Sequence, residues 1–297
     1  MSDMVNVPDI GFRGHDFGKL ASASELAQRA KDALENSCIQ FAPKKVLASV
    51  PDILTQEWAE DCEKAFSEKN IRVAVLGCYI NPVHPDEEKM EAELRRFENN
   101  LSAAPYLKAK IVATETGSRN ANNTHNPENW TEKTFSLFVK NLERLLKKAE
   151  ENKTILAIEA VSYKNTIDNA ERMLRVMEIF KHPNMRVLFD AVNILPVKGV
   201  DDMHAFYDET VSMLAPYICA LHVKDYVWQE KDKQIPELEG PFKLGEIPVG
   251  EGLMPWTDIF ALYKKYNCDK VPMLLENFNP VTLQNSIKYV KESYAKS

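Results

Sequence analysis

Four ionisable residues each end a short apolar run in the second half of the chain. The runs are Ile155–Glu159, Val187–Asp190, Ile218–His222 and Met273–Glu276, and their last residues lie 31, 32 and 54 positions apart. The first two intervals each suit one buried strand followed by one crossover helix. The third interval is longer by about the length of one insertion. The four groups therefore occupy equivalent places at the ends of four successive strands.

Three carboxylates and one imidazole that meet in a buried place would repel one another unless a cation joined them. We therefore predict that Glu159, Asp190, His222 and Glu276 bind one divalent metal ion. Three oxygen donors and one nitrogen suit Mn²⁺ or Mg²⁺, and Co²⁺ and Zn²⁺ are also compatible with this set. The competing interpretation is that each residue is an isolated strand-end group that caps the following helix. Four such groups at equivalent positions favour the metal.

The chain as a whole alternates short apolar segments with longer amphipathic ones. The predicted strands are Asp9–Arg13, Ser37–Phe41, Arg72–Gly77, Ala109–Thr114, Ile155–Ala160, Arg186–Asp190, Ile218–Val223 and Val271–Leu275. The predicted helices are Ser22–Asn36, Thr55–Lys69, Asp86–Ala103, Thr131–Asn152, Asn169–Phe180, Asp202–Leu214, Met254–Tyr266 and Val281–Tyr294. Apolar strands in strict alternation with helices indicate right-handed βαβ crossovers and a parallel sheet.

Two closures of such a sheet are possible, an open doubly wound sheet and a closed (β/α)8 TIM barrel. Eight units and the absence of a Gly-rich turn after the first strand favour the barrel, as a single domain over residues 1–297. Two connections, Glu115–Trp130 and Asp225–Gly252, are longer than the alternation needs. Both follow strand ends, where barrel enzymes build their sites, and we read the second as ordered coil or a lid.

The composition excludes several other classes of protein. The chain has 297 residues, a net charge of −7 and 44% hydrophobic residues, which is typical of a folded acidic protein. No apolar run approaches the ~18 residues of a membrane span. No block of basic residues is present to neutralise phosphates, and the five irregularly spaced cysteines include no Cys-x-x-Cys pair. We expect a cytoplasmic protein with no nucleic-acid or membrane partner.

The strand-end residues, with His222 inside a Leu221-His-Val-Lys-Asp225 run, resemble the xylose isomerase-like TIM barrel superfamily of sugar phosphate isomerases and epimerases. Gly250-Glu-Gly252 also looks like a segment of that family, and the resemblance spans nearly the whole chain. It implies the same four metal ligands. In the ketose 3-epimerases of this superfamily, the carboxylates equivalent to Glu159 and Glu276 also form the acid/base pair. The resemblance further implies a homodimer or homotetramer.

The chain departs from the ketose 3-epimerase pattern on the substrate side. Asn193, Trp228 and Asn165 stand where those enzymes have a histidine, an arginine and a second glutamate. The departures affect residues that would bind a free ketohexose substrate, and they leave the predicted metal ligands intact. The additional histidines with which endonuclease IV binds its zinc cluster have no counterpart here, which argues against DNA repair.

Five further residues are candidates for contact with substrate: His15, Glu115, Asn193, Lys224 and Trp228. Lys224 lies two residues after His222, so it has the same strand parity and is predicted to face the same interior. Trp228 is a candidate lid aromatic over a sugar ring. His15 and Glu115 follow the first and fourth strands, and an ordinary loop role is equally compatible with each.

These observations predict a metal-dependent isomerase or epimerase of a sugar or another small polyhydroxy carbonyl compound, acting through an enediolate. Such a metal acidifies the C–H bond next to a carbonyl, and two carboxylates on different sides of the barrel could move the proton. A metal-dependent lyase or dehydratase needs the same deprotonation and stays an alternative. An endonuclease-like hydrolase and a non-catalytic sugar-binding barrel are weaker alternatives.

Overall fold

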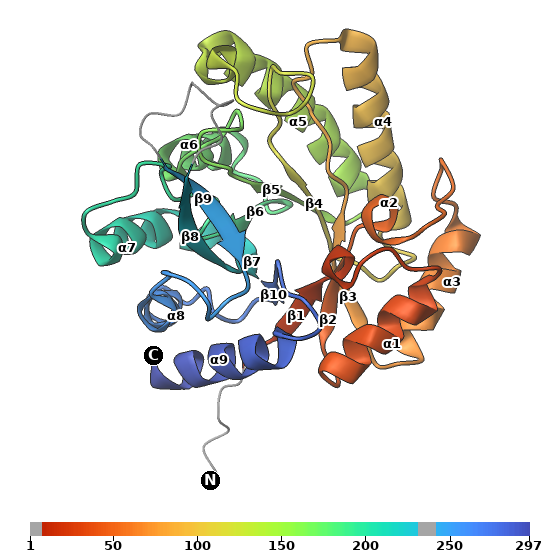
Figure 1. The fold of residues 1–297 in the computed structure, drawn as a ribbon. Helices are drawn as coiled ribbons and strands as arrows, with labels where there is room; N and C mark the ends of the chain where they lie inside the picture. The colour runs from red at the N-terminus through yellow and green to blue at the C-terminus, as the bar shows by residue number, and fades with distance from the viewer. Residues whose placement is uncertain (1–7, 231–241) are drawn as a thin grey trace.

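The computed structural model describes residues 8–230 and 242–297, and its centre is a closed barrel of parallel strands (Figure 1). The barrel strands are β1 (Ile10–Arg13), β2 (Cys38–Phe41), β3 (Arg72–Gly77), β4 (Ile111–Glu115), β5 (Ile155–Glu159), β6 (Met185–Asp190), β7 (Ile218–Val223) and β10 (Met273–Leu275). Neighbours in the barrel follow chain order, and β10 pairs with β1 to close the ring. The predicted barrel is confirmed, and each predicted strand boundary lies within two residues of the observed one.

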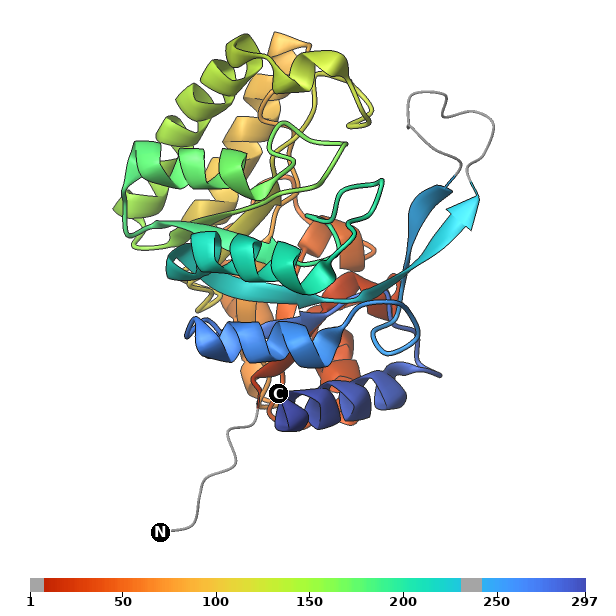
Figure 2. The same ribbon diagram turned by 90° about the vertical axis from the view of Figure 1, so that its left-hand side faces the viewer.

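Helices form a layer around the barrel (Figures 1 and 2). They are α1 (Ala23–Ala33), the short α2 (Pro43–Val46), α3 (Gln56–Ser67), α4 (Glu87–Ala103), α5 (Glu132–Glu151), α6 (Ala170–Phe180), α7 (Met203–Leu214), α8 (Trp256–Lys265) and α9 (Leu283–Lys296). Several begin at a side-chain cap: Ser22, Thr55 and Thr131 each accept a hydrogen bond from a backbone N–H of the first turn. Among the described residues, no helix combines the length and apolar character needed to cross a bilayer.

The inside of the barrel is packed with a small apolar cluster. Its members come from all the barrel strands except β1: Cys38, Ala74, Val75, Ile111, Ala113, Ala157, Leu188, Ala220 and Leu274. Larger side chains such as Phe41, Phe138 and Trp256 fill the space between the strands and the helices. Because side chains alternate between the two faces of a strand, a residue two positions after a cluster member also faces the barrel interior.

The connection after β7 contains an antiparallel hairpin, so it differs from the predicted coil. Strands β8 (Asp225–Glu230) and β9 (Phe242–Ile247) pair in register, with Asp225 opposite Ile247 and Trp228 opposite Leu244. Figure 2 shows the hairpin extending away from the barrel at the end where β7 finishes. Residues 231–241 of this connection lie outside the described residues. The alternation around Tyr226-Val-Trp228 was the missed strand signal.

The connection after β4 is irregular, as predicted, with one short 3₁₀ helix, η2 (Pro127–Trp130). Two buried asparagines tie it to the barrel. Asn81 Nδ2 donates to the carbonyl of Ser118 at 2.7 Å, and Asn129 Nδ2 donates to the carbonyl of Lys164 at 2.9 Å. The loop is therefore fixed against the segments that follow β3 and β5.

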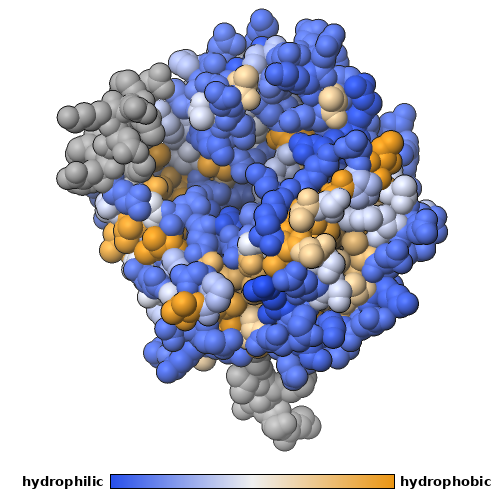
Figure 3. Space-filling model, turned by 45° about the vertical axis from the view of Figure 1, so that its right-hand side comes forward, coloured by the Kyte–Doolittle hydropathy of each residue, from blue (hydrophilic) through white to orange (hydrophobic). Residues whose placement is uncertain are grey.

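Figure 3 shows that hydrophilic residues cover most of one face of the molecule, with apolar residues gathered in a few patches.

The base of the hairpin is held by a single buried carboxylate. Asp225 Oδ1 accepts hydrogen bonds from the backbone N–H of Tyr226 at 3.0 Å and of Met254 at 2.8 Å, and Oδ2 accepts one from Gly250 at 3.1 Å. Gly250 has a φ of 91°, which favours glycine, so the chain can turn back there toward α8. Asp225 thus joins the first residue of the hairpin to the segment that follows it.

We expect Asp225→Ala to lower the free energy of unfolding by roughly 2–3 kcal/mol, because it leaves buried N–H groups without an acceptor. Asp202→Ala is the matched control, since Asp202 accepts one backbone hydrogen bond at the exposed start of α7. Its loss should cost only about 1 kcal/mol. Urea unfolding measures both values, and amide exchange should accelerate in β8 and β9 for Asp225→Ala alone. Equal destabilisation by the two variants would contradict this account of the hairpin.

Candidate metal centre

A layer of polar side chains lies directly above the apolar cluster inside the barrel. Its members each follow a cluster residue, or Gly11 in β1, by two positions: Arg13, Gln40, Glu115, Glu159, Asp190, His222 and Glu276. Strand register keeps them level, since Asp190 pairs with His222 and Glu115 pairs with Glu159. The polar ends that interrupt the apolar runs of the sequence thus meet at the carboxyl end of the barrel.

His222 lies at the centre of this layer and faces three carboxylates with one nitrogen. Its Nδ1 lies 3.2 Å from Glu276 Oε1, 3.3 Å from Glu159 Oε1 and 3.6 Å from Asp190 Oδ2. All four side chains are at most 4% exposed. A single N–H can make one good hydrogen bond, so this arrangement does not satisfy the three carboxylates. Three carboxylate oxygens that converge on one imidazole nitrogen form an arrangement that is typical of a metal site.

The other nitrogen of His222 is held by a neighbour on β2. His222 Nε2 lies 2.8 Å from Gln40 Oε1, which can only accept, so Nε2 carries a proton and Nδ1 is the nitrogen that would exchange its proton for an ion. Gln40 is itself oriented by a hydrogen bond of 3.1 Å from its Nε2 to the Tyr79 hydroxyl. Metal-bound histidines commonly have such a partner on the second nitrogen. Gln40 therefore fixes the tautomer that a metal would need.

The donor set fits a divalent ion in both geometry and charge. One atom each of Glu159, Asp190 and His222 lie within 4.8 Å of one another. Asp190 Oδ2 is buried and accepts no hydrogen bond from any described residue, although Lys224 Nζ lies 2.9 Å away. Lys224 neutralises one of the three carboxylate charges and leaves about two. Buried Glu159, Asp190 and His222 could thus hold a metal ion, and a dication would balance the remaining charge.

Glu276 differs from the other three because one of its oxygens is already held by cations. Its Oε1 faces His222, whereas Oε2 lies 3.1 Å from Lys224 Nζ and 3.1 Å from an Arg13 nitrogen. Arg13 is in turn held by Asp16, to which it donates two hydrogen bonds of 2.7 and 2.9 Å. Glu276 can therefore offer one oxygen to an ion. Its assignment as a fourth ligand stays a prediction.

Burial and charge act in opposite directions on the pKa values of this cluster. Burial alone would lower the pKa of His222, but Glu276 and Glu159 raise it to about 10. Burial would also raise the pKa of Asp190 and of Glu276, yet the neighbouring cations Lys224 and His222 hold both pKa values below their usual range. For Glu159 burial prevails, and its pKa is raised. The cluster keeps its negative charge only with the help of cations.

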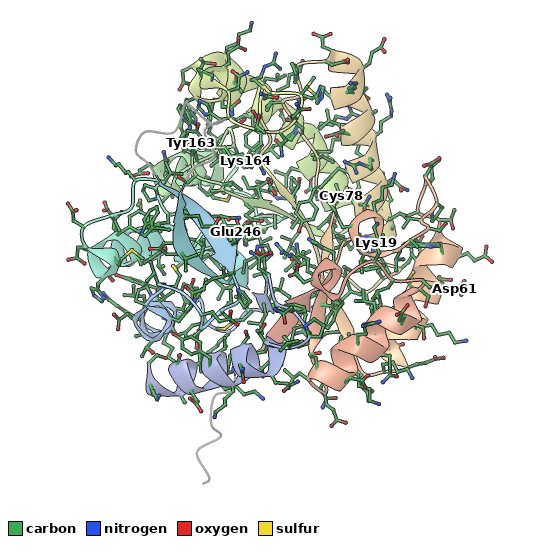
Figure 4. All side chains as sticks on the ribbon, viewed as in Figure 1. Lys19, Asp61, Cys78, Tyr163, Lys164 and Glu246 are labelled. Carbon is green, nitrogen blue, oxygen red and sulfur yellow. The ribbon has the colours of Figure 1, made fainter. Side chains whose placement is uncertain are left out.

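A cavity of about 240 Å³ opens above the cluster and is lined almost entirely by charged and polar groups. Its walls are Arg13, Tyr79, Glu115, Glu159, Val161, Lys164, Asn193, Lys224, Glu246 and Glu276. Asn193 Nδ2 donates to Glu159 Oε1 at 2.6 Å, and Asn193 Oδ1 accepts from Lys224 Nζ at 2.8 Å. Glu246, on β9, lies 3.3 Å from Lys224 Nζ and brings the hairpin to the mouth. The labelled Glu246 lies in front of the barrel strands in Figure 4.

The predicted substrate residues divide into two groups in space. Glu115, Asn193 and Lys224 line the cavity. His15 lies beside it, with its ring 6.0 Å from that of Tyr79, and burial together with Arg13 lowers its pKa to about 4. Trp228 lies on β8, is 37% exposed and packs against Tyr226 with ring centroids 5.5 Å apart. It is not among the residues that line the cavity.

Several residues of the site were missed at the sequence level. Gln40 is a polar residue in a fully buried strand, which is the same signal that led to the predicted metal ligands, so it could have been found. Arg13, at the end of the first strand, carried the same signal. Lys164 and Glu246 carried no such signal. Lys164 lies in a loop, and Glu246 reaches the mouth only because the hairpin folds back over it.

Comparison of the sequence with protein-family models identifies the family of this chain. The model of the xylose isomerase-like TIM barrel family matches residues 30–295. The chain belongs to this family. No curated protein matched it by sequence. The closed parallel barrel of this chain agrees with the fold that the family description names.

Solved structures of similar shape include several enzymes. The apo form of 3-keto-D-glucoside 4-epimerase YcjR from E. coli has a TM-score of 0.68 and 13% identity, over 96% of this chain and 99% of that one. The probable 3-DHS dehydratase AsbF from Bacillus anthracis has a TM-score of 0.68 and 14% identity, over 95% and 98%. A xylose isomerase-like TIM barrel protein from Mycobacterium smegmatis, in complex with magnesium, has a TM-score of 0.67 and 16% identity, over 98% of both. At such identities these likenesses show the fold.

If the cluster binds a metal, removal and return of the ion should change the stability of the protein. We expect Mn²⁺ at 100 times its dissociation constant to raise the thermal midpoint of chelator-treated protein by roughly 4–5 °C, because binding stabilises only the folded state. Asp190→Asn should abolish this response. The variant keeps a carbonyl oxygen to accept the backbone hydrogen bonds of Val192 and Asn193, so it should fold.

Asp208→Asn is the control, because Asp208 is a carboxylate on the outside of α7 that contacts Lys265. It should respond to Mn²⁺ like the wild type in differential scanning calorimetry. An unchanged midpoint of the wild type with Mn²⁺, Mg²⁺, Co²⁺ and Zn²⁺ would contradict the metal centre.

Proposed function

We propose that this protein is a divalent-metal-dependent isomerase or epimerase of a small polyhydroxy carbonyl compound. The main support for this proposal is that Glu159, Asp190 and Glu276 converge on His222 Nδ1 at the base of a polar cavity. Membership of the xylose isomerase-like family and the epimerases among proteins of the same fold support it. We name Mn²⁺ or Mg²⁺ as the ion because carboxylate oxygens predominate in the donor set.

The ion would be held by Glu159, Asp190, His222 and Glu276, with Gln40 and Asn193 orienting His222 and Glu159. When bound, it would polarise a carbonyl and thereby acidify the adjacent C–H bond of the substrate. The chain's own groups then have to move the proton. Glu159 and Glu276 come from β5 and β10, which are separated by β6 and β7 in the barrel. Two carboxylates on different sides of a planar enediolate can remove a proton from one face and return it to the other.

Lys224 and Arg13 would have positioning roles in this reaction. Both contact Glu276 Oε2 at 3.1 Å, so they fix the direction of its other oxygen toward the centre of the cluster. Lys224 is 2% exposed, and its Nζ is also within 2.8–3.3 Å of oxygens of Asn193, Asp190 and Glu246. A cation held by four oxygens stabilises the cluster. A positioning role in the cluster is compatible with the prediction that Lys224 also contacts substrate at the cavity wall.

The charges of the cavity favour a substrate without a phosphate or carboxylate group. Each described cation of the wall is already paired: Arg13 with Asp16 and Glu276, Lys164 with Glu115 at 3.1 Å, and Lys224 with Asp190 and Glu276. Recognition of a phosphate usually needs Arg or Lys donors that are available to it. Glu115 and Glu246 offer oxygen acceptors for hydroxyl groups instead. We therefore propose an uncharged sugar as substrate.

Proton exchange into substrate in D₂O tests this function. Metal-loaded protein should exchange the proton next to the carbonyl of D-fructose or of methyl 3-keto-β-D-glucopyranoside, followed by NMR, and should leave fructose 6-phosphate untouched. We expect Glu276→Gln and Glu159→Gln each to reduce the exchange rate by about 10²–10⁴-fold, the usual contribution of a general acid or base. The exposed Glu150→Gln on α5 should behave like the wild type.

Metal content is measured in the same samples, so that loss of the ion is distinguished from loss of proton transfer. Exchange accompanied by inversion of the carbon supports the epimerase, and exchange accompanied by loss of water would indicate a dehydratase. Normal exchange by a metal-loaded Glu276→Gln variant would contradict the role given to that residue. Absence of exchange from the metal-loaded wild type with both sugars would contradict the enediolate mechanism.

A further inference from the structure

The cavity of about 240 Å³ above the cluster of Glu159, Asp190, His222 and Glu276 is called here the metal-side cavity. A second cavity, of about 320 Å³, lies beside it. Its wall consists of His125, Trp130, Ser162, Tyr163, Asp168, Pro196, Val197 and Lys198. The segment after β5 separates the two spaces. Val161 and Lys164 line the metal-side cavity, whereas Ser162 and Tyr163, between them in sequence, line the second one. Figure 4 shows Lys164 nearer to the middle of the barrel than Tyr163.

The second cavity is built from aromatic rings, in contrast to the charged metal-side cavity. The rings of His125 and Tyr163 stack with centroids 4.4 Å apart and an interplanar angle of 11°. Trp130 lies 5.0 Å from His125 and is 37% exposed. Tyr163 has a φ of 67°, an uncommon conformation for a residue with a side chain. The backbone is fixed there by a hydrogen bond of 3.0 Å between His125 Nδ1 and the Tyr163 carbonyl.

Hydrogen-bonding groups accompany the rings in this wall. Among the described residues, Asp168 forms a long ion pair of 3.9 Å with Arg172, and its carboxylate accepts a hydrogen bond of 3.2 Å from Asn169 Nδ2. Lys198 and Ser162 add one ammonium and one hydroxyl. Flat aromatic faces with a few polar groups are typical of sites that bind a ring-shaped ligand. The metal-side wall, by comparison, offers Tyr79 and Val161 but no aromatic stack.

The two cavities adjoin along the segment that follows β5. Val161 and Lys164 border the metal-side cavity of about 240 Å³, and Ser162 and Tyr163 border the second cavity of about 320 Å³. The second cavity by itself lies at the lower end of the 300–1,000 Å³ that is usual for small-molecule pockets. Ser162 N donates to the Asn193 carbonyl at 2.6 Å, so the wall between them is tied to a residue that orients Glu159. A ligand that spans both spaces would therefore be sensed at the metal cluster.

We propose that the second cavity binds the ring of an aglycone, so that the substrate is a glycoside whose sugar lies in the metal-side cavity. This inference rests on the proposed function and specifies its substrate. The aromatic wall recognises the non-reacting ring by stacking, and the charged wall recognises the hydroxyl groups of the sugar. Binding energy from the remote ring would also hold the sugar in place over Glu159 and Glu276.

Calorimetric titration with two glycosides that differ only in the aglycone tests the proposal. The probes are phenyl β-D-glucopyranoside and methyl β-D-glucopyranoside, titrated into metal-loaded protein. We expect the phenyl glycoside to bind about tenfold more tightly, because one added aromatic contact is worth about one factor of ten. Trp130→Ala should reduce this preference to less than threefold. His125→Ala, which removes a different ring of the same wall, should do the same.

Tyr106→Ala is the matched control, since Tyr106 is 39% exposed, like Trp130, but lies in the connection between α4 and β4, at the opposite end of the barrel. It should keep the full preference. Equal binding of the two glycosides, no measurable binding of the phenyl glycoside, or a preference that survives both Trp130→Ala and His125→Ala would overturn the proposal. The titration is repeated on chelator-treated protein. A phenyl preference without metal-dependent proton exchange would support the aglycone cavity while contradicting the proposed function.

Discussion

The mutual repulsion of Glu159, Asp190 and Glu276 is the constraint on which the rest of the site depends. The three carboxylates are almost fully buried around one imidazole nitrogen, and burial of unpaired charge is among the most unfavourable events in folding. Lys224 and Arg13 reduce the repulsion, but Arg13 is shared with Asp16. A divalent ion at His222 Nδ1 would remove the remaining repulsion. The same ion would supply the Lewis acid that an enediolate reaction requires.

The barrel supports this cluster by a simple alternation along its strands. Apolar residues such as Ala157, Leu188 and Ala220 fill the interior, and the next inward positions carry Glu159, Asp190 and His222. The apolar layer closes the barrel beneath the site and keeps water from reaching it from below. The loops above are tied down by buried asparagines and by Asp225, so the upper wall is also ordered. Catalytic groups placed on strands in this way are held more firmly than groups on loops.

The sequence was sufficient to predict the barrel and the central cluster. Each strand is an apolar run, and the polar residue at its end is visible because it breaks that run, as at Glu159 and His222. Side-chain parity then predicted that Lys224 would face the interior, where the structure places it. These features depend on contacts within one strand or between neighbouring strands, which the pattern of residues records directly.

The features that the sequence did not predict depend on how distant segments fold back. The hairpin of β8 and β9 was read as ordered coil or a lid because its pairing joins residues 12 to 22 positions apart. Glu246 reaches the cavity only through that hairpin, and Lys164 reaches it from the loop that follows β5. Trp228 packs against Tyr226 on the hairpin, and its contact with substrate stays a prediction. The aromatic cavity likewise joins His125 and Trp130 to Tyr163, from loops that no periodic pattern connects.

The difference between the two cavities gives the proposed substrate its form. A wall of paired charges suits the hydroxyl groups of an uncharged sugar, and a wall of stacked rings suits a flat substituent next to it. A metal ion held by the carboxylates and His222 at the base of the first cavity is the common requirement of both proposals. Its existence can be tested without knowledge of the substrate.

Anomalous diffraction at the manganese absorption edge, from crystals grown with Mn²⁺, tests the central claim most directly. We predict one anomalous peak inside the barrel, about 2.0–2.4 Å from His222 Nδ1 and from carboxylate oxygens of Glu159, Asp190 and Glu276. A map without a peak at this place, with Lys224 Nζ in the centre of the four side chains, would contradict it.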